Sequence, residues 1–131
     1  MIQRRFLIIG SLMAVLAVAL GAFAAHGLKP NLTEHQIRIF ETGTRYHFYH
    51  TFAILIVALL ADKLPAKKLN TIGWLFTIGI LLFSGSLYLL AIRDLLGVTW
   101  SFLGPLTPLG GTLFIIGWVI LLFEAIKMKK I

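Results

Sequence analysis

Four long stretches without a formally charged residue divide this chain. They are residues 6–28, 46–61, 70–92 and 95–123. A helix rises about 1.5 Å per residue, so about 20 apolar residues cross a hydrocarbon core about 30 Å thick. The pattern therefore predicts a single integral membrane domain, residues 1–131, with four helical spans. The expected spans cover residues 6–25, 45–62, 71–92 and 108–126.

The segment between the first two spans carries a helix signal of its own. Gln36 follows Thr33 by three residues, the spacing of a capping box at a helix N-terminus. Ile37 and Phe40 then share one helical face, so we expect a short amphipathic helix on the outer membrane surface, with a bend at Gly43. The predicted fold is all-α: a four-helix antiparallel transmembrane bundle with a short external amphipathic helix.

The second uncharged stretch is shorter than the others. Its 16 residues form about 24 Å of helix, less than the hydrocarbon thickness. Either the bilayer thins around this helix, or the helix begins earlier and carries Arg45 and Glu41 into the outer interface.

The first span has small residues along one face, at positions 10, 14, 17, 21 and 25. Such a face allows another helix to approach closely, within the bundle or, alternatively, in a dimer. The same segment resembles a secretory signal peptide, with two arginines before an apolar run. The run is longer than a signal peptide needs, so we predict an uncleaved span packed within the bundle.

Composition and charge agree with a membrane protein. Hydrophobic residues make up 59% of the chain and charged residues 13%, against about 25% in soluble domains. There is no cysteine, which excludes thiolate chemistry and disulfides.

The net charge of +7 has an uneven distribution along the chain. Eight of the twelve basic residues fall on the side of the N-terminus, whereas Lys29, Arg38, Arg45 and Arg93 fall on the other. The positive-inside rule then predicts that both termini are cytoplasmic, facing anionic lipid and not nucleic acid.

Polar side chains gather near the predicted outer face. We expect a hydrogen-bonded cluster that joins the first three spans there, with a Glu41–Arg45 pair at i,i+4 spacing. His50 should face the interior and bond to a residue of the first or third span. The cluster comprises His26, Glu41, Arg45, Tyr46, His50, Ser84, Ser86 and Tyr88.

These residues allow three chemical interpretations. A metal site from His26, His47, His50 and Glu41 lacks the spacing of an HExxH motif, so we expect neither a metal nor a cofactor. Hydrolysis has no support, because Ser84 and Ser86 lack a strand-to-helix elbow. We therefore expect a non-enzymatic structural, assembly or partner-binding role. The alternative is a small transporter or ion- or proton-conducting protein that uses the polar cluster.

Four motifs in order along the chain resemble those of one family. Segment 21–28, GAFAAHGL, resembles a GAFGAHGL signature, and segment 45–50, RYHFYH, resembles its YQMYH segment. Segments 83–88, FSGSLY, and 107–111, TPLGG, match two more. The chain thus resembles the small bacterial inner-membrane proteins of the YgdD/YwdK type, a family of unknown function with four predicted spans.

The resemblance implies a location in the bacterial plasma membrane and supplies no activity. The chain departs from the family pattern at Ala24, which replaces a glycine, and at His47, which replaces a glutamine. Glutamine is a poor substitute for imidazole at a metal, which weakens any ligand role for His47. The sequence is compatible with a homo-oligomer and with a membrane-protein partner.

Overall fold

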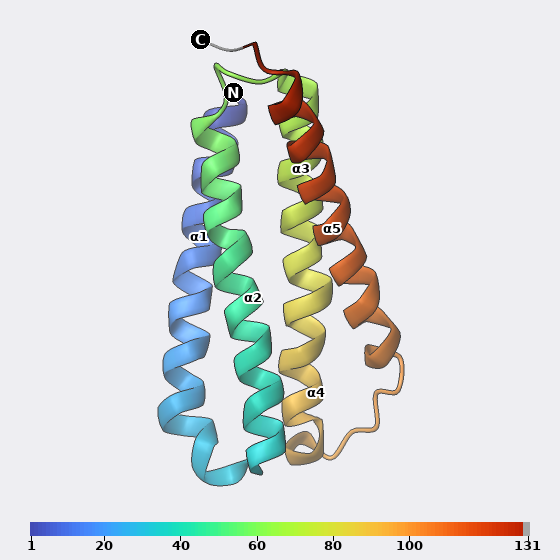
Figure 1. Cartoon of the computed structure of the whole chain (residues 1–131). Coiled ribbons are helices and arrows are strands. Elements are labelled where there is room, and N and C mark those ends of the chain that lie inside the picture. The colour runs from blue at the N-terminus through green and yellow to red at the C-terminus, as the bar shows by residue number, and fades with distance from the viewer. Residues whose placement is uncertain (130–131) are drawn as a thin grey trace.

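Helices account for nearly all of the computed structural model, which describes residues 1–129 (Figure 1). Within these residues there is no strand, and the expected all-α fold of four helical segments is confirmed. The elements are α1 (Ile2–Phe23), the π-helical turn η1 (Ala24–Leu28), the 3-10 turn η2 (Lys29–Asn31), α2 (Glu34–Leu59), α3 (Ala66–Gly79), the π-helical turn η3 (Ile80–Ser84), α4 (Gly85–Leu96) and α5 (Leu103–Lys127).

Three of the four segments are long and apolar enough to cross a membrane. By length and composition these are Ile2–Asn31, Ala66–Leu96 and Leu103–Lys127. The fourth segment, α2, is 26 residues long and carries four charged residues in the half that follows its N-terminus.

The expected external helix exists but is not separate from the second span. Thr33 caps α2 itself: its backbone N–H donates to Gln36 Oε1 over 2.9 Å, and the Gln36 N–H donates to Thr33 Oγ1 over 3.2 Å. From there α2 continues without a break through Gly43 to Leu59. Gly43 does not bend the chain; a Cβ on it would lie 3.0 Å from the Tyr88 ring, so the missing side chain lets α4 approach.

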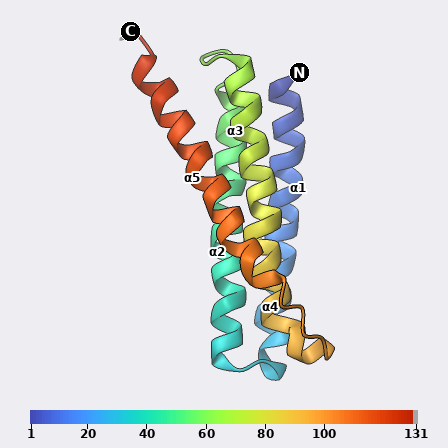
Figure 2. The ribbon, with the colours of Figure 1, turned by 90° about the vertical axis from the view of Figure 1, so that its right-hand side faces the viewer.

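The helices run antiparallel, and the N-terminus and the last described turn of α5 lie at the same end of the bundle (Figure 1). The connections from α1 to α2 and from α4 to α5 lie at the other end. Helix α1 packs mainly along α2, and α5 packs mainly along α3 and η3. Figure 2 shows that α5 is tilted and crosses the third segment obliquely.

The core consists of two apolar clusters of unequal size. The larger one joins α1, α2, α3 and α5 and contains Phe6, Ile54, Phe76 and Phe114 among its buried members. The smaller one, Leu28, Phe40 and Ala91, lies at the end where η1 meets α2 and α4.

The small-residue face of α1 packs within the chain. Gly10 and Ala17 are buried, and a Cβ on Gly10 would lie 2.8 Å from Leu55 Cγ of α2. Within this face Gly10 and Ala17 pack inside the chain, whereas Ala25 is exposed.

Among the glycines, the closest approach to the backbone of another element is where α5 meets η3. A Cβ on Gly110 would lie 2.8 Å from the Phe83 Cα, and backbone cannot move aside as a side chain can. We expect Gly110→Ala to destabilise the protein by about 1–3 kcal/mol. The matched control is Gly104→Ala in the same helix, where a Cβ meets nothing within 4 Å. That change should be neutral or stabilise by at most about 1 kcal/mol.

Thermal unfolding of both variants in one detergent, followed by circular dichroism, compares these changes. Equal melting temperatures for Gly110→Ala and Gly104→Ala would contradict the close contact of α5 with η3.

Candidate functional site

The predicted polar residues form separate pairs between helices and not one cluster. Tyr88 of α4 bonds to His47 of α2, with 2.8 Å between its hydroxyl oxygen and His47 Nδ1. His47 is buried. Its pairing was not predicted, because His47 departs from the glutamine of the motif that segment 45–50 resembles. A glutamine side chain also offers hydrogen-bonding groups to a tyrosine, so the substitution is compatible with a structural role for this pair.

His50 is 4% exposed and faces the interior, as expected, but its partner is not on the first or third span. Its Nε2 accepts a hydrogen bond from Trp118 Nε1 of α5 over 3.0 Å. The indole can only donate, so Nε2 must be unprotonated, and Nδ1–H donates to the Tyr46 carbonyl over 2.8 Å. The expectation was wrong because the oblique path of α5 brings Trp118 to the middle of α2.

Aromatic rings surround the His50 imidazole. It stacks on Phe114 with 3.5 Å between ring centroids and an interplanar angle of 8°. Phe76 and Trp118 approach it edge-on at 5.5 Å and 5.9 Å. With both ring nitrogens bonded, this histidine has no free nitrogen for a metal ion.

The two serines of segment 83–88 differ in their hydrogen bonds. Ser86 Oγ donates to the Phe83 carbonyl over 2.9 Å, so the 2.6 Å contact with Thr107 is donated by the Thr107 hydroxyl and joins α4 to α5. Ser84, at the end of the π-helical turn η3, is fully buried, and its Oγ has no hydrogen-bond partner among residues 1–129.

The remaining predicted residues lie toward the end of the bundle where α1 connects to α2. His26 is exposed on η1 and makes no hydrogen bond to the others. The expected Glu41–Arg45 ion pair is absent from the described part of the chain; Glu34 and Arg38 form one instead, at 3.9 Å and largely exposed. An exposed pair of this spacing is worth only a few tenths of a kcal/mol, too little to fix two long side chains. Tyr46 is 38% exposed and lies against Phe83.

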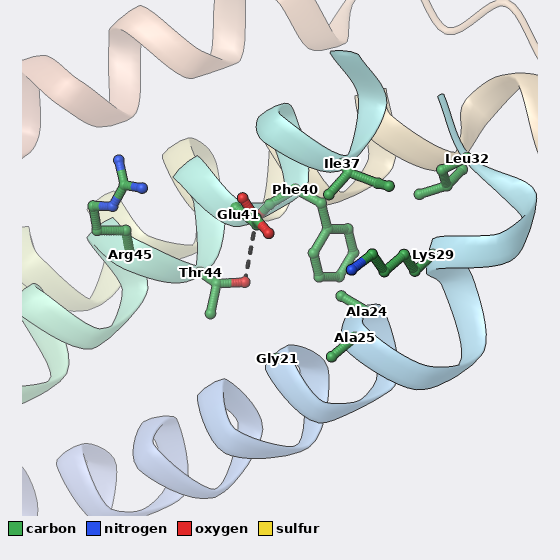
Figure 3. A pocket seen from close by; sticks show the side chains of 10 residues that line it. All are labelled: Gly21, Ala24, Ala25, Lys29, Leu32, Ile37, Phe40, Glu41, Thr44 and Arg45. Atoms are coloured by element: carbon green, nitrogen blue, oxygen red, sulfur yellow. Dashed lines mark hydrogen bonds between the residues drawn. The ribbon is translucent and has the colours of Figure 1, made fainter. Parts of the chain in front are cut away.

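Glu41 and Arg45 instead line a pocket between η1 and α2 of about 350 Å³ (Figure 3). The helices are farther apart here than at Gly10, because a Cβ on Gly21 would meet Thr44 at an ordinary 3.5 Å. The lining residues are Gly21, Ala24, Ala25, Lys29, Leu32, Ile37, Phe40, Glu41, Thr44 and Arg45.

The pocket combines an apolar floor with charges of both signs. Phe40 is buried, and its ring forms part of the floor, while the Lys29 side chain extends toward it from η2 (Figure 3). Thr44 turns its hydroxyl to the Phe40 carbonyl over 3.2 Å, which leaves its methyl group on the side of Gly21. Lys29, Glu41 and Arg45 are the charged members. A ligand here would meet two cations, one carboxylate and apolar surface.

Possible metal ligands do not gather at one place in the described part of the chain. Among residues 1–129, no three His, Asp or Glu side chains converge as ligands for a metal ion.

Comparison with known proteins identifies the family. A family model described as "Protein of unknown function (DUF423)" matches residues 20–111. This chain belongs to that family. It is 46% identical over 123 residues to the UPF0382 membrane protein YwdK of Bacillus subtilis, covering 93% of this chain and 96% of YwdK. A UPF0382 membrane protein of Haemophilus influenzae is 44% identical over 98% of this chain and 99% of its own length.

A third relative is the UPF0382 membrane protein SAB0533 of Staphylococcus aureus, 41% identical over 95% of this chain and 98% of its own length. No solved structure matches the chain. The relatives are named membrane proteins, so the apolar helices and the family agree that this DUF423 chain is a membrane protein of an uncharacterised family.

The hydrogen bond between His47 and Tyr88 predicts which substitutions of His47 the protein tolerates. His47→Gln keeps a side chain that can bond to the Tyr88 hydroxyl and should lower the free energy of unfolding by less than about 1 kcal/mol. His47→Leu leaves the phenol without a partner and should lower it by about 1–3 kcal/mol. Thermal unfolding in detergent measures both. A His47→Gln variant as unstable as His47→Leu would contradict a structural role for the hydrogen bond.

Proposed function

We propose that this DUF423 protein is a non-enzymatic, multi-pass protein of the bacterial plasma membrane that acts by binding at its outward end. The observation that carries the proposal is the charged pocket between η1 and α2. The eight basic residues on the side of the termini support an orientation in which both termini are cytoplasmic.

The depth of the pocket supports this function. Arg5 donates to Asn70 Oδ1 over 2.7 Å, a polar contact suited to the cytoplasmic boundary of the membrane. About 30 Å of hydrocarbon corresponds to about 20 residues of helix, which brings the outer boundary near Ala25. Ala25 lines the pocket, so the pocket opens where lipid head groups meet the acyl chains.

The packing below the pocket favours binding over transport. Met13 and Ala17 of α1 and Thr51 of α2 are buried. The Thr51 hydroxyl donates to the His47 carbonyl over 2.8 Å, within its own helix, and so is not available to a passing solute. A transporter needs a wet cavity that reaches the bilayer middle, and these contacts support a dry interior instead.

The geometry of the polar residues also favours a non-enzymatic role. A nucleophilic serine needs a base within hydrogen-bonding reach. Ser84 has no hydrogen-bond partner among residues 1–129, and Ser86 bonds to Thr107 and to the Phe83 carbonyl. Neither serine therefore has the neighbour that acyl transfer requires.

Two buried atoms without a hydrogen-bond partner among residues 1–129, His47 Nε2 and Ser84 Oγ, favour the alternative, a small transporter or ion-conducting protein. A buried hydroxyl without a partner costs free energy, and Ser84 Oγ lies in a π-helical turn, a feature frequent at functional sites. A water or solute bonded to Ser84 would relieve that cost. The two functions differ in whether water reaches the depth of Thr51 from the pocket.

Labelling of single cysteines separates these functions, since the chain has no cysteine of its own. Thr44 lines the pocket and Thr51 is buried seven residues farther along α2, about 10 Å deeper on nearly the same helical face. A membrane-impermeant maleimide applied to intact cells should label Thr44→Cys and leave Thr51→Cys unmodified.

Two further variants control for orientation. Arg38→Cys should react in intact cells, and Lys67→Cys only after the membrane is opened. The reverse result would overturn the proposed orientation. Labelling of Thr51→Cys at a rate close to that of Thr44→Cys, together with ion or proton flux into liposomes that hold the purified protein, would favour the transporter instead.

A further inference from the structure

We propose that the outward pocket binds the head group of a zwitterionic aminophospholipid, which carries a phosphate and a primary ammonium. This inference rests on the proposed function and names the ligand class of the same site. The lipid would enter from the outer leaflet, with its phosphate near Lys29 and Arg45, its ammonium near Glu41 and its glycerol and acyl chains continuing inward from Arg45 into the bilayer.

Arg45 provides the first reason for an anionic group. It has no ion-pair partner among residues 1–129, although an acid stands four residues before it. It also lies on the helical turn that faces Gly21, at or below the outer boundary of the hydrocarbon, where an uncompensated charge is costly. A phosphate would supply the missing negative charge, and guanidinium binds phosphate through two parallel hydrogen bonds.

Lys29 adds a second cation from a different element. It comes from the 3-10 turn η2, whereas Arg45 comes from α2, and the two residues line the same pocket. In Figure 3 the lysine side chain extends over the pocket from one end, and Arg45 lies at the other end. The two cations therefore mark the two ends of the pocket along α2.

Glu41 determines which head group fits. It lies on α2 one helical turn from Arg45, about 6 Å along the axis, on the pocket wall. A carboxylate there repels a lipid whose head group carries only negative charge, but it can accept hydrogen bonds from an ammonium, which has three donors. The lining, with two cations and one acid, is therefore complementary to a phosphate linked to an amine.

The remaining walls are apolar or small. Phe40, Leu32 and Ile37 lie on the outward side of Arg45, where they suit the methylene groups of the head group, and Gly21, Ala24 and Ala25 leave space on the side of α1. The volume of about 350 Å³ is within the range of small-ligand sites, about 300–1,000 Å³. It is large enough for a head group and its glycerol, while the acyl chains would lie in the bilayer.

Native mass spectrometry of the full chain in detergent tests this assignment, with dioleoyl phosphatidylethanolamine and dioleoyl phosphatidylglycerol as probes. The two lipids share the phosphate and the acyl chains, and only the first carries an amine. We expect the wild-type protein to bind phosphatidylethanolamine several-fold more tightly.

The variants separate the roles of the three charges. Arg45→Gln and Lys29→Gln should each weaken the binding of phosphatidylethanolamine about tenfold, which corresponds to the loss of a charge-assisted hydrogen bond. Glu41→Gln should abolish the preference, so that the two lipids bind with similar affinity. The matched control is Arg38→Gln, which removes an exposed cation of the same helix outside the pocket and should change neither affinity.

Three results would overturn the assignment. They are equal binding of the two lipids by the wild-type protein, an Arg45→Gln variant that binds like Arg38→Gln, and displacement of the lipid by millimolar inorganic phosphate, which would indicate a site for the free anion. Each of them leaves the labelling contrast between Thr44→Cys and Thr51→Cys untouched, so failure of the lipid assignment is distinguishable from failure of the proposed function.

Discussion

Close contact between helices through small residues is the constraint on which the rest of this structure depends. Lipid chains are as apolar as the side chains they touch, so helices in a membrane associate through packing and hydrogen bonds rather than through exclusion of water. Phenylalanine rings accordingly lie on glycines of a neighbouring helix: Phe6 on Gly73 and Phe76 on Gly117, where a Cβ would meet the Phe76 ring at 2.7 Å. Gly110 meets the Phe83 backbone where α5 packs against η3. The looser contact at the end where α1 connects to α2 leaves room for the pocket.

Much of the fold follows from local patterns in the sequence. The uncharged stretches and the spacing of Thr33 and Gln36 were sufficient to predict an all-α bundle and the N-terminus of α2. The continuity of α2 was not predictable in the same way, because charged residues after Thr33 indicated a surface helix and Gly43 indicated a bend. What keeps this region helical is tertiary packing: Phe40 is buried against Tyr88 of α4, with 4.7 Å between ring centroids.

The candidate site was predicted in part, and the reason is geometric. Periodicity shows which side chains share a helical face, so the buried position of His50 and the contribution of Tyr88 and Ser86 to contacts between helices were accessible. The partner of His50 was not, because Trp118 reaches it only through the crossing angle of α5, which no local pattern encodes. Glu41 and Arg45 were the signal of the pocket in the sequence, but we expected them to form an ion pair with each other. Both line the pocket instead.

We propose that a charged, lipid-binding pocket lies above a closed core. A crystal structure of the protein grown in a lipid phase that contains phosphatidylethanolamine would show both features. We expect density for a phosphate within ion-pair distance, about 4 Å, of Lys29 and Arg45, and no ordered water between the pocket and Thr51. Ordered water molecules leading from the pocket to His50 would contradict this expectation. An empty pocket in which Arg45 pairs with Glu41 would contradict it as well.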